Sequence, residues 1–172
     1  MKRFQLMSLS VTTLFLPLTL QADSAHEHGS ARLDVAVDGT QLHIALQSPL
    51  DNLVGFEHAP RNERQRAALA KMEATLREAA RLFTPDAAAR CRADHVEIEH
   101  PHGAAAPAAD AAGHADAQAR WTFVCEAPQS LRRLDVQLFD AFRGLRRLKA
   151  QTATPRGQGA ATLTPARRAL AL

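Results

Sequence analysis

The pattern of apolar and polar positions predicts a hairpin early in the chain. Apolar residues at a spacing of two are Leu33, Val35, Val37, Leu42, Ile44 and Leu46. This spacing places the apolar side chains on one face of each strand, and polar or small residues on the other. Between the two runs stands Asp38-Gly39, a typical turn between antiparallel strands. We therefore expect two paired strands with one buried face and one face in water.

The apolar spacing changes to three and four between residues 62 and 83. The apolar positions there are Ala68, Leu69, Met72, Leu76, Ala79, Ala80 and Phe83. Arg, Lys and Glu occupy most of the other positions, as is typical of an amphipathic helix with a solvated face. Thr84-Pro85 is expected to end this helix. Residues 50–60, between the hairpin and the helix, are expected to form an ordered loop.

The second half of the chain predicts more strands. Period-two or apolar runs lie at residues 90–99, 121–126, 134–138, 145–152 and 159–163, and the tail at 164–172 is expected to be a frayed helix. Residues 100–119 are rich in Ala and Gly and contain few large apolar side chains, which predicts a mobile surface loop containing His and Asp. The sum is an α+β fold, with a mostly antiparallel sheet and one long helix.

The first 22 residues have the features of a secretory signal peptide. Lys2 and Arg3 precede an apolar stretch, which Pro17 interrupts, and a small residue, Ala22, follows it. The stretch is too short to favour a spanning helix, so we expect no stable membrane insertion after cleavage; an uncleaved anchor is the alternative. The mature chain, residues 23–172, has the length of a single domain. Without Lys2 and Arg3 it is nearly neutral, which gives no electrostatic basis for binding nucleic acid.

Both cysteines, Cys91 and Cys125, fall in the exported part. In an oxidising compartment two cysteines most simply form a disulfide. The alternative makes them zinc ligands beside His95 or His100. Thiolate zinc sites usually contain closely spaced Cys pairs, and the sequence has none, so we favour the disulfide.

The histidines are the candidate metal ligands. The chain has eight: His26, His28, His43, His58, His95, His100, His102 and His114. Two His-x-His pairs, at 26–28 and 100–102, would each place two imidazoles on the same side of an extended segment. Zinc takes about four such ligands and accepts carboxylates among them, so the two pairs predict metal binding. The alternative for each pair is a solvated segment without a ligand.

The other histidines carry weaker signals. His114 lies with Asp110 and Asp116 close after the second pair, which strengthens a metal-binding interpretation of that stretch. His58 follows Glu57 in the expected loop, either as a further ligand or as a packing contact. His43 and His95 are isolated strand residues, for which a surface or hydrogen-bonded role is expected.

Enzymatic motifs are absent from the sequence. It contains no phosphate-binding loop, no nucleophile elbow and no His-Glu-x-x-His helix. A catalytic zinc site would need a general base, and Glu57 is the one candidate. The sequence therefore does not predict an enzyme.

Six segments resemble the ZrgA-type zinc-uptake proteins of Gram-negative bacteria. They are AHEHG at 25–29, ARLDV at 31–35, SPLDN at 48–52, GFEH at 55–58, WTFVC at 121–125 and LFDAF at 138–142. The resemblance covers nearly all of the mature chain and implies a periplasmic zinc-binding protein that works with an inner-membrane uptake transporter. Its N-terminal chelate falls on His26 and His28, its Phe-Glu-His on residues 56–58, and its variable loop on residues 100–116.

Three hypotheses follow for the function. The leading one is a periplasmic protein that captures or buffers zinc and passes it to an uptake system. Its expected ligands are His26, His28, Glu57, His58, His100, His102 and His114. The second is a disulfide-tied module that binds another envelope protein, with incidental histidines, and the third is a zinc hydrolase. Imidazole and carboxylate ligands also suit copper and nickel, so the sequence leaves the native metal open.

Overall fold

The computed structural model describes residues 28–103 and 115–172. The strands are β1 (Ser30–Asp38), β2 (Gln41–Pro49), β3 (Phe83–Pro85), β4 (Cys91–Glu99), β5 (Asp116–Cys125), β6 (Arg133–Val136), β7 (Arg147–Thr154), β8 (Gly157–Leu163) and β9 (Ala169–Ala171). The α-helices are α1 (Leu50–Val54), α2 (Glu63–Arg77), α3 (Ala79–Leu82) and α4 (Leu138–Ala141), and two short 3-10 turns occupy Ala87–Ala89 and Pro128–Ser130.

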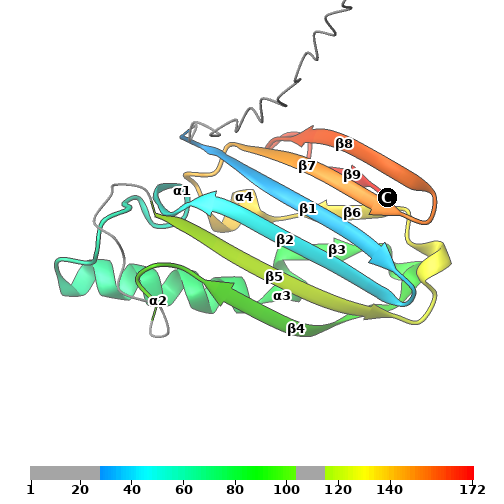
Figure 1. Ribbon diagram of the computed structural model, residues 1–172, viewed down its shortest axis with the longest axis horizontal. Coiled ribbons are helices and arrows are strands. Elements are labelled where there is room, and N and C mark those ends of the chain that lie inside the picture. Colours follow the sequence, from blue (N-terminus) through cyan, green and yellow to red (C-terminus); the bar gives the residue numbers. More distant parts are fainter. Residues whose placement is uncertain (1–27, 104–114) are drawn as a thin grey trace, which may run out of the picture.

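Two sheets organise these elements (Figure 1). The large sheet has the order β4-β5-β2-β1-β7-β8, and the small one has the order β3-β6-β9. Neighbouring strands are antiparallel, except that β1 and β7 run parallel. The predicted α+β class with a mostly antiparallel sheet is confirmed, and α2 is the one long helix of the described residues.

The core lies between one face of the large sheet and the layer formed by α2, α3 and the small sheet, which lie behind it in Figure 1. Trp121 on β5 is 1% exposed, and its indole N–H donates to the carbonyl of Leu76 at the end of α2, at 2.7 Å. Its ring also meets the edge of Phe83, with 4.7 Å between centroids. Because Trp121 both packs and hydrogen-bonds, it fixes α2 against the sheet.

The early hairpin is confirmed. Val35 pairs with Ile44 and Asp38 with Gln41, so Gly39 and Thr40 form the turn between β1 and β2. Gly39 has a φ of 55°, a left-handed conformation that glycine adopts without strain. The large apolar residues of both strands are buried except for Val37, which is half-buried.

Four expectations about local structure were wrong. Residues 50–54 form the short helix α1 instead of a loop, and the long helix breaks at Glu78, whose ψ of 57° separates α2 from α3. The tail does not form a helix, because β9 pairs with β6 through Leu170 and Leu134. Asp116 to Ala119 belong to β5, since Ala117 pairs with Ser48 on β2. The loop predicted at 100–119 is therefore shorter at its C-terminal end.

The disulfide is confirmed. Cys91 and Cys125 occupy paired positions at one end of β4 and β5, and their sulfurs are 2.01 Å apart. Both cysteines are thereby used, which contradicts the alternative of thiolate zinc ligands.

Candidate metal centre

One end of the large sheet brings the predicted ligands to neighbouring segments (Figure 1). At this end β1 begins, β2 runs into α1, β4 ends and β5 begins, because these strands alternate in direction. His28 precedes β1, His58 lies in the loop after α1, and His100 and His102 follow β4. His26 and His114 lie outside the described residues.

Asn52 of α1 fixes the entry into β1. Its side-chain oxygen accepts from the Gly29 N–H at 2.6 Å, and its amide donates to the Ser30 carbonyl at 2.9 Å and to the Ser48 hydroxyl at 3.2 Å. The residue is 2% exposed. Gly144 packs so closely here that an added Cβ would lie 2.5 Å from the Asn52 carbonyl oxygen. The segment bearing His28 is therefore anchored at Gly29.

Replacing Asn52 with alanine is expected to lower the free energy of unfolding by about 1–3 kcal/mol, because buried backbone groups lose their partners. Urea denaturation measures this change. The control is D51A, which removes a neighbouring carboxylate whose contact is with the exposed His28. This change should alter stability by less than about 0.5 kcal/mol. Equal stability of N52A and D51A would contradict the anchoring role.

His28 and His58 are the exposed candidates. His28 Nδ1 lies 3.1 Å from a carboxylate oxygen of Asp51, and the His28 side chain is 84% exposed. His58 Nδ1 lies 2.8 Å from the Ala59 carbonyl oxygen, and its ring stacks on Phe56 with 5.3 Å between centroids. Each ring is thus oriented by one neighbour and open to solvent.

His100 is the buried candidate. Its Nε2 lies 2.9 Å from Oε1 of Glu73 on α2, and its side chain is 2% exposed. The second oxygen of Glu73 accepts from Arg77 at 3.0 Å. The hydrogen bond from His100 lowers the pKa of Glu73, Arg77 lowers it further, and partial burial opposes both. Glu73 is therefore a carboxylate at neutral pH.

His102 joins two of these segments. Its Nε2 lies 2.8 Å from the backbone oxygen of Glu57, which links the turn after β4 to the loop that carries His58. The Gly103 N–H donates to the His100 carbonyl at 3.1 Å, so residues 100–103 form a turn. The expectation that His100 and His102 share one side of an extended segment was wrong, because the turn directs the two imidazoles to different partners.

The four histidines have one feature in common. In each, one ring nitrogen faces an oxygen of a carboxylate or a carbonyl, and we assign the proton to that nitrogen because these oxygens only accept. The other nitrogen then carries a lone pair. A metal-ligating histidine has this arrangement, with one N–H held by an oxygen and the opposite nitrogen on the metal.

The histidines do not converge on one point. Among residues 28–103 and 115–172, no group of three or more His, Cys, Asp or Glu is close enough together to hold a metal ion. Glu57 makes a further interaction of its own, so it is not a free residue. The described geometry therefore provides oriented candidate ligands on adjoining segments, without a completed coordination sphere.

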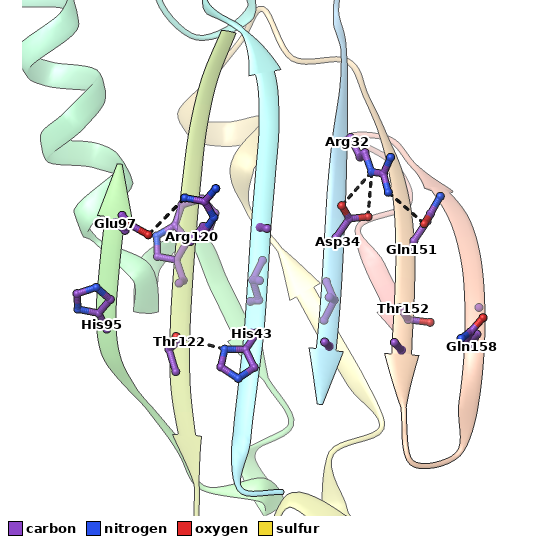
Figure 2. Close-up of a pocket in the computed structure, with 17 residues that line it drawn as sticks. Arg32, Asp34, His43, His95, Glu97, Arg120, Thr122, Gln151, Thr152 and Gln158 are labelled. Carbon is purple, nitrogen blue, oxygen red and sulfur yellow. Dashed lines mark hydrogen bonds and ion pairs between the residues drawn. The ribbon is translucent and has the colours of Figure 1, made fainter. Parts of the chain in front are cut away.

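His43 and His95 lie elsewhere, on the open face of the large sheet (Figure 2). Both pair with Thr122 on β5, one from each side, and the Thr122 hydroxyl lies 3.4 Å from His43 Nδ1. Arg32 and Asp34 form an ion pair on the same face. As expected for isolated strand histidines, both are surface residues among polar neighbours.

Sequence reasoning missed Asn52 and Glu73. The segment SPLDN contributes to the family resemblance, and the resemblance gives its last residue no role. A Pro shortly before the polar pair Asp-Asn is nevertheless a signal for a local hydrogen-bonded structure. Glu73 was assigned to the solvated face of the helix. Its side chain is 28% exposed, and nothing in the helical pattern indicates a partner from β4.

Comparison with protein-family models gives one decisive match. Residues 25–172 match the model described as ZrgA family zinc uptake protein. The chain belongs to the ZrgA family. The suspected resemblance is thus confirmed, and it covers both sheets and all the oriented histidines. No curated protein matches this chain closely enough to count as a relative.

Membership of the ZrgA family gives the chain a role in zinc uptake and an association with zinc. The family is described by uptake and not by an enzymatic reaction. Family and disulfide are consistent with an exported protein. Within the described part of this ZrgA protein, none of the helices has the length and apolar character needed to cross a membrane.

Proposed function

We propose that the protein is a periplasmic zinc carrier that captures the ion through imidazoles at the α1 end of the large sheet and passes it to an inner-membrane uptake transporter. The observation that carries this proposal is the common orientation of His28, His58, His100 and His102, in a family that takes up zinc. Each presents a lone pair, and zinc needs about four such donors.

The arrangement suits a cargo more than a resident cofactor. His28 and His58 are exposed and lie on short segments, so they are placed to meet an ion from solvent. His100 is buried against α2 and is placed to retain it. To complete the coordination sphere of zinc, these segments must approach one another, or His26, Glu57 or His114 must supply the remaining ligands. No catalytic step is part of this proposal.

The route to the periplasm is part of the proposal. Residues 1–22 would be the signal peptide and residues 23–172 the mature zinc-binding domain. The disulfide supports an oxidising compartment, because cytosolic thiols are kept reduced.

Titration of the mature protein with zinc, in competition with a chelator of known affinity, tests the proposal. Saturable binding is expected, and free zinc at 100 times Kd should stabilise the fold by about 2.7 kcal/mol. Binding should weaken below about pH 6, because protonated imidazole does not ligate. Parallel titrations with copper and nickel identify the preferred metal.

Metal-free protein that binds no zinc, and whose melting temperature does not change on adding it, would reject the carrier proposal. That result would favour the protein-interaction module with incidental histidines.

A further inference from the structure

The contact between α2 and the end of β4 leaves one nitrogen unexplained. His100 Nε2 lies 2.9 Å from Glu73 Oε1, while His100 Nδ1 is buried and has no hydrogen-bond partner in the part of the chain that the structure describes. Buried polar atoms without a partner are rare in folded proteins, and an ion is one of the accepted explanations.

The tautomer of His100 follows from its neighbour. A carboxylate oxygen only accepts, so the nitrogen that faces Glu73 must carry a proton. A second proton, on Nδ1, would be a buried donor with nothing to receive it, and this arrangement is unfavourable. The neutral ring, with its proton on Nε2 and a lone pair on Nδ1, is therefore the form that fits the described contacts.

Glu73 is itself held in place. Its other oxygen accepts from Arg77, one turn further along α2, so the carboxylate is fixed on both sides. Leu69, Met72 and Leu76 bury the adjoining face of the helix in the core, and Glu73 lies at the edge of that face. The orientation of the His100 ring is thus tied to α2, the long helix that packs on the core.

We propose that Glu73 is a positioning residue that holds the proton on His100 Nε2 and presents His100 Nδ1 as a buried zinc-ligating nitrogen. The inference rests on the proposed zinc-binding function and adds to it a residue outside the expected ligand set, together with the identity of the ligating atom. Carboxylate–histidine–metal units of this kind orient the ring and raise the basicity of the ligand.

The first test uses the wild-type protein with ¹⁵N-labelled histidine at neutral pH. Long-range ¹H–¹⁵N spectra distinguish a protonated, a free and a metal-bound ring nitrogen. The expected result is a protonated Nε2 in the zinc-free protein, and a change at Nδ1 of His100 on adding zinc. A zinc-dependent change at Nε2 of His100, or at neither nitrogen, would overturn the inference even if zinc binds.

The second test compares variants of the carboxylate. E73A should weaken zinc binding by about 10- to 100-fold and leave His100 as a mixture of tautomers. E73Q should rescue both, because the glutamine side-chain oxygen accepts the same proton, while Arg77 is largely exposed and can hydrogen-bond to water instead. The control, E63A, removes a carboxylate on the exposed side of the same helix and should not change zinc affinity.

The outcomes separate the two proposals. Failure of the wild-type protein to bind zinc would reject the zinc-carrier function, whatever Glu73 does. Normal zinc binding by the wild type and E73A alike, with an unchanged His100 tautomer, would reject only the role of Glu73. If E73A does not fold, the wild-type spectra and the E73Q affinity still decide the question.

Discussion

Zinc affinity is expected to fall at least about 100-fold when His100 and His102 are both replaced with glutamine. Loss of a residue that only hydrogen-bonds to a metal ligand typically lowers affinity about 10- to 100-fold, and loss of two ligands should lower it at least as much. In the proposed site these two residues are the ligands on the β4 side, one of them buried and the other joined to the Glu57 backbone. Glutamine keeps most of the side-chain volume, so the core around His100 is filled. Competition titration with a chromogenic chelator measures the change.

The chain contains a matched control for this experiment. His43 and His95 lie on the open face of the same sheet, and neither contacts the oriented histidines in any described interaction. The H43Q/H95Q double variant removes the same number of imidazoles and should keep the wild-type affinity within about twofold. Equal losses in both double variants would mean that zinc binds through histidine content and not through this site.

Removing the disulfide is the second large effect. The C91A/C125A variant is expected to lose about 4 kcal/mol of stability, because the bond closes a loop of 34 residues that is otherwise free in the unfolded chain. β4 is an edge strand, which pairs only with β5 in the large sheet. Urea denaturation of the variant and of the oxidised and reduced wild type measures the difference.

Reduced wild type and the double variant should unfold at the same urea concentration, because both lack the same bond. A loss below about 1 kcal/mol would contradict the expectation. It would show that the pairing between β4 and β5 keeps the fold stable without the disulfide.

The parts of the fold that sequence predicted correctly are those governed by local pattern. Alternation around Asp38-Gly39 predicts the hairpin of β1 and β2 and the face that it buries, because a period of two places the apolar side chains on one face. The turn itself lies one residue later than predicted, at Gly39 and Thr40. The five residues of α1 are too few for a helical period to be visible. β9 forms because Leu170 pairs with Leu134, a partner that no local pattern reveals.

In the candidate site, too, the sequence predicts the residues that depend on local pattern but not the contacts that depend on the fold. Residue type and spacing identify His28, His58, His100 and His102, because imidazole is intrinsically a metal ligand. Their hydrogen-bond partners depend on the fold: Glu73 lies 27 residues from His100, and Glu57 lies 45 residues from His102. The turn at residues 100–103, which separates the two imidazoles, also depends on these contacts.

The most direct test of the zinc-carrier account is a crystal of the mature protein grown with one equivalent of zinc, with anomalous scattering recorded on both sides of the zinc edge. The account predicts an anomalous peak at the α1 end of the large sheet, about 2.0–2.1 Å from imidazole nitrogens that include His100 Nδ1. Peaks confined to the open face around His43 and His95, or no ordered zinc at all, would contradict it.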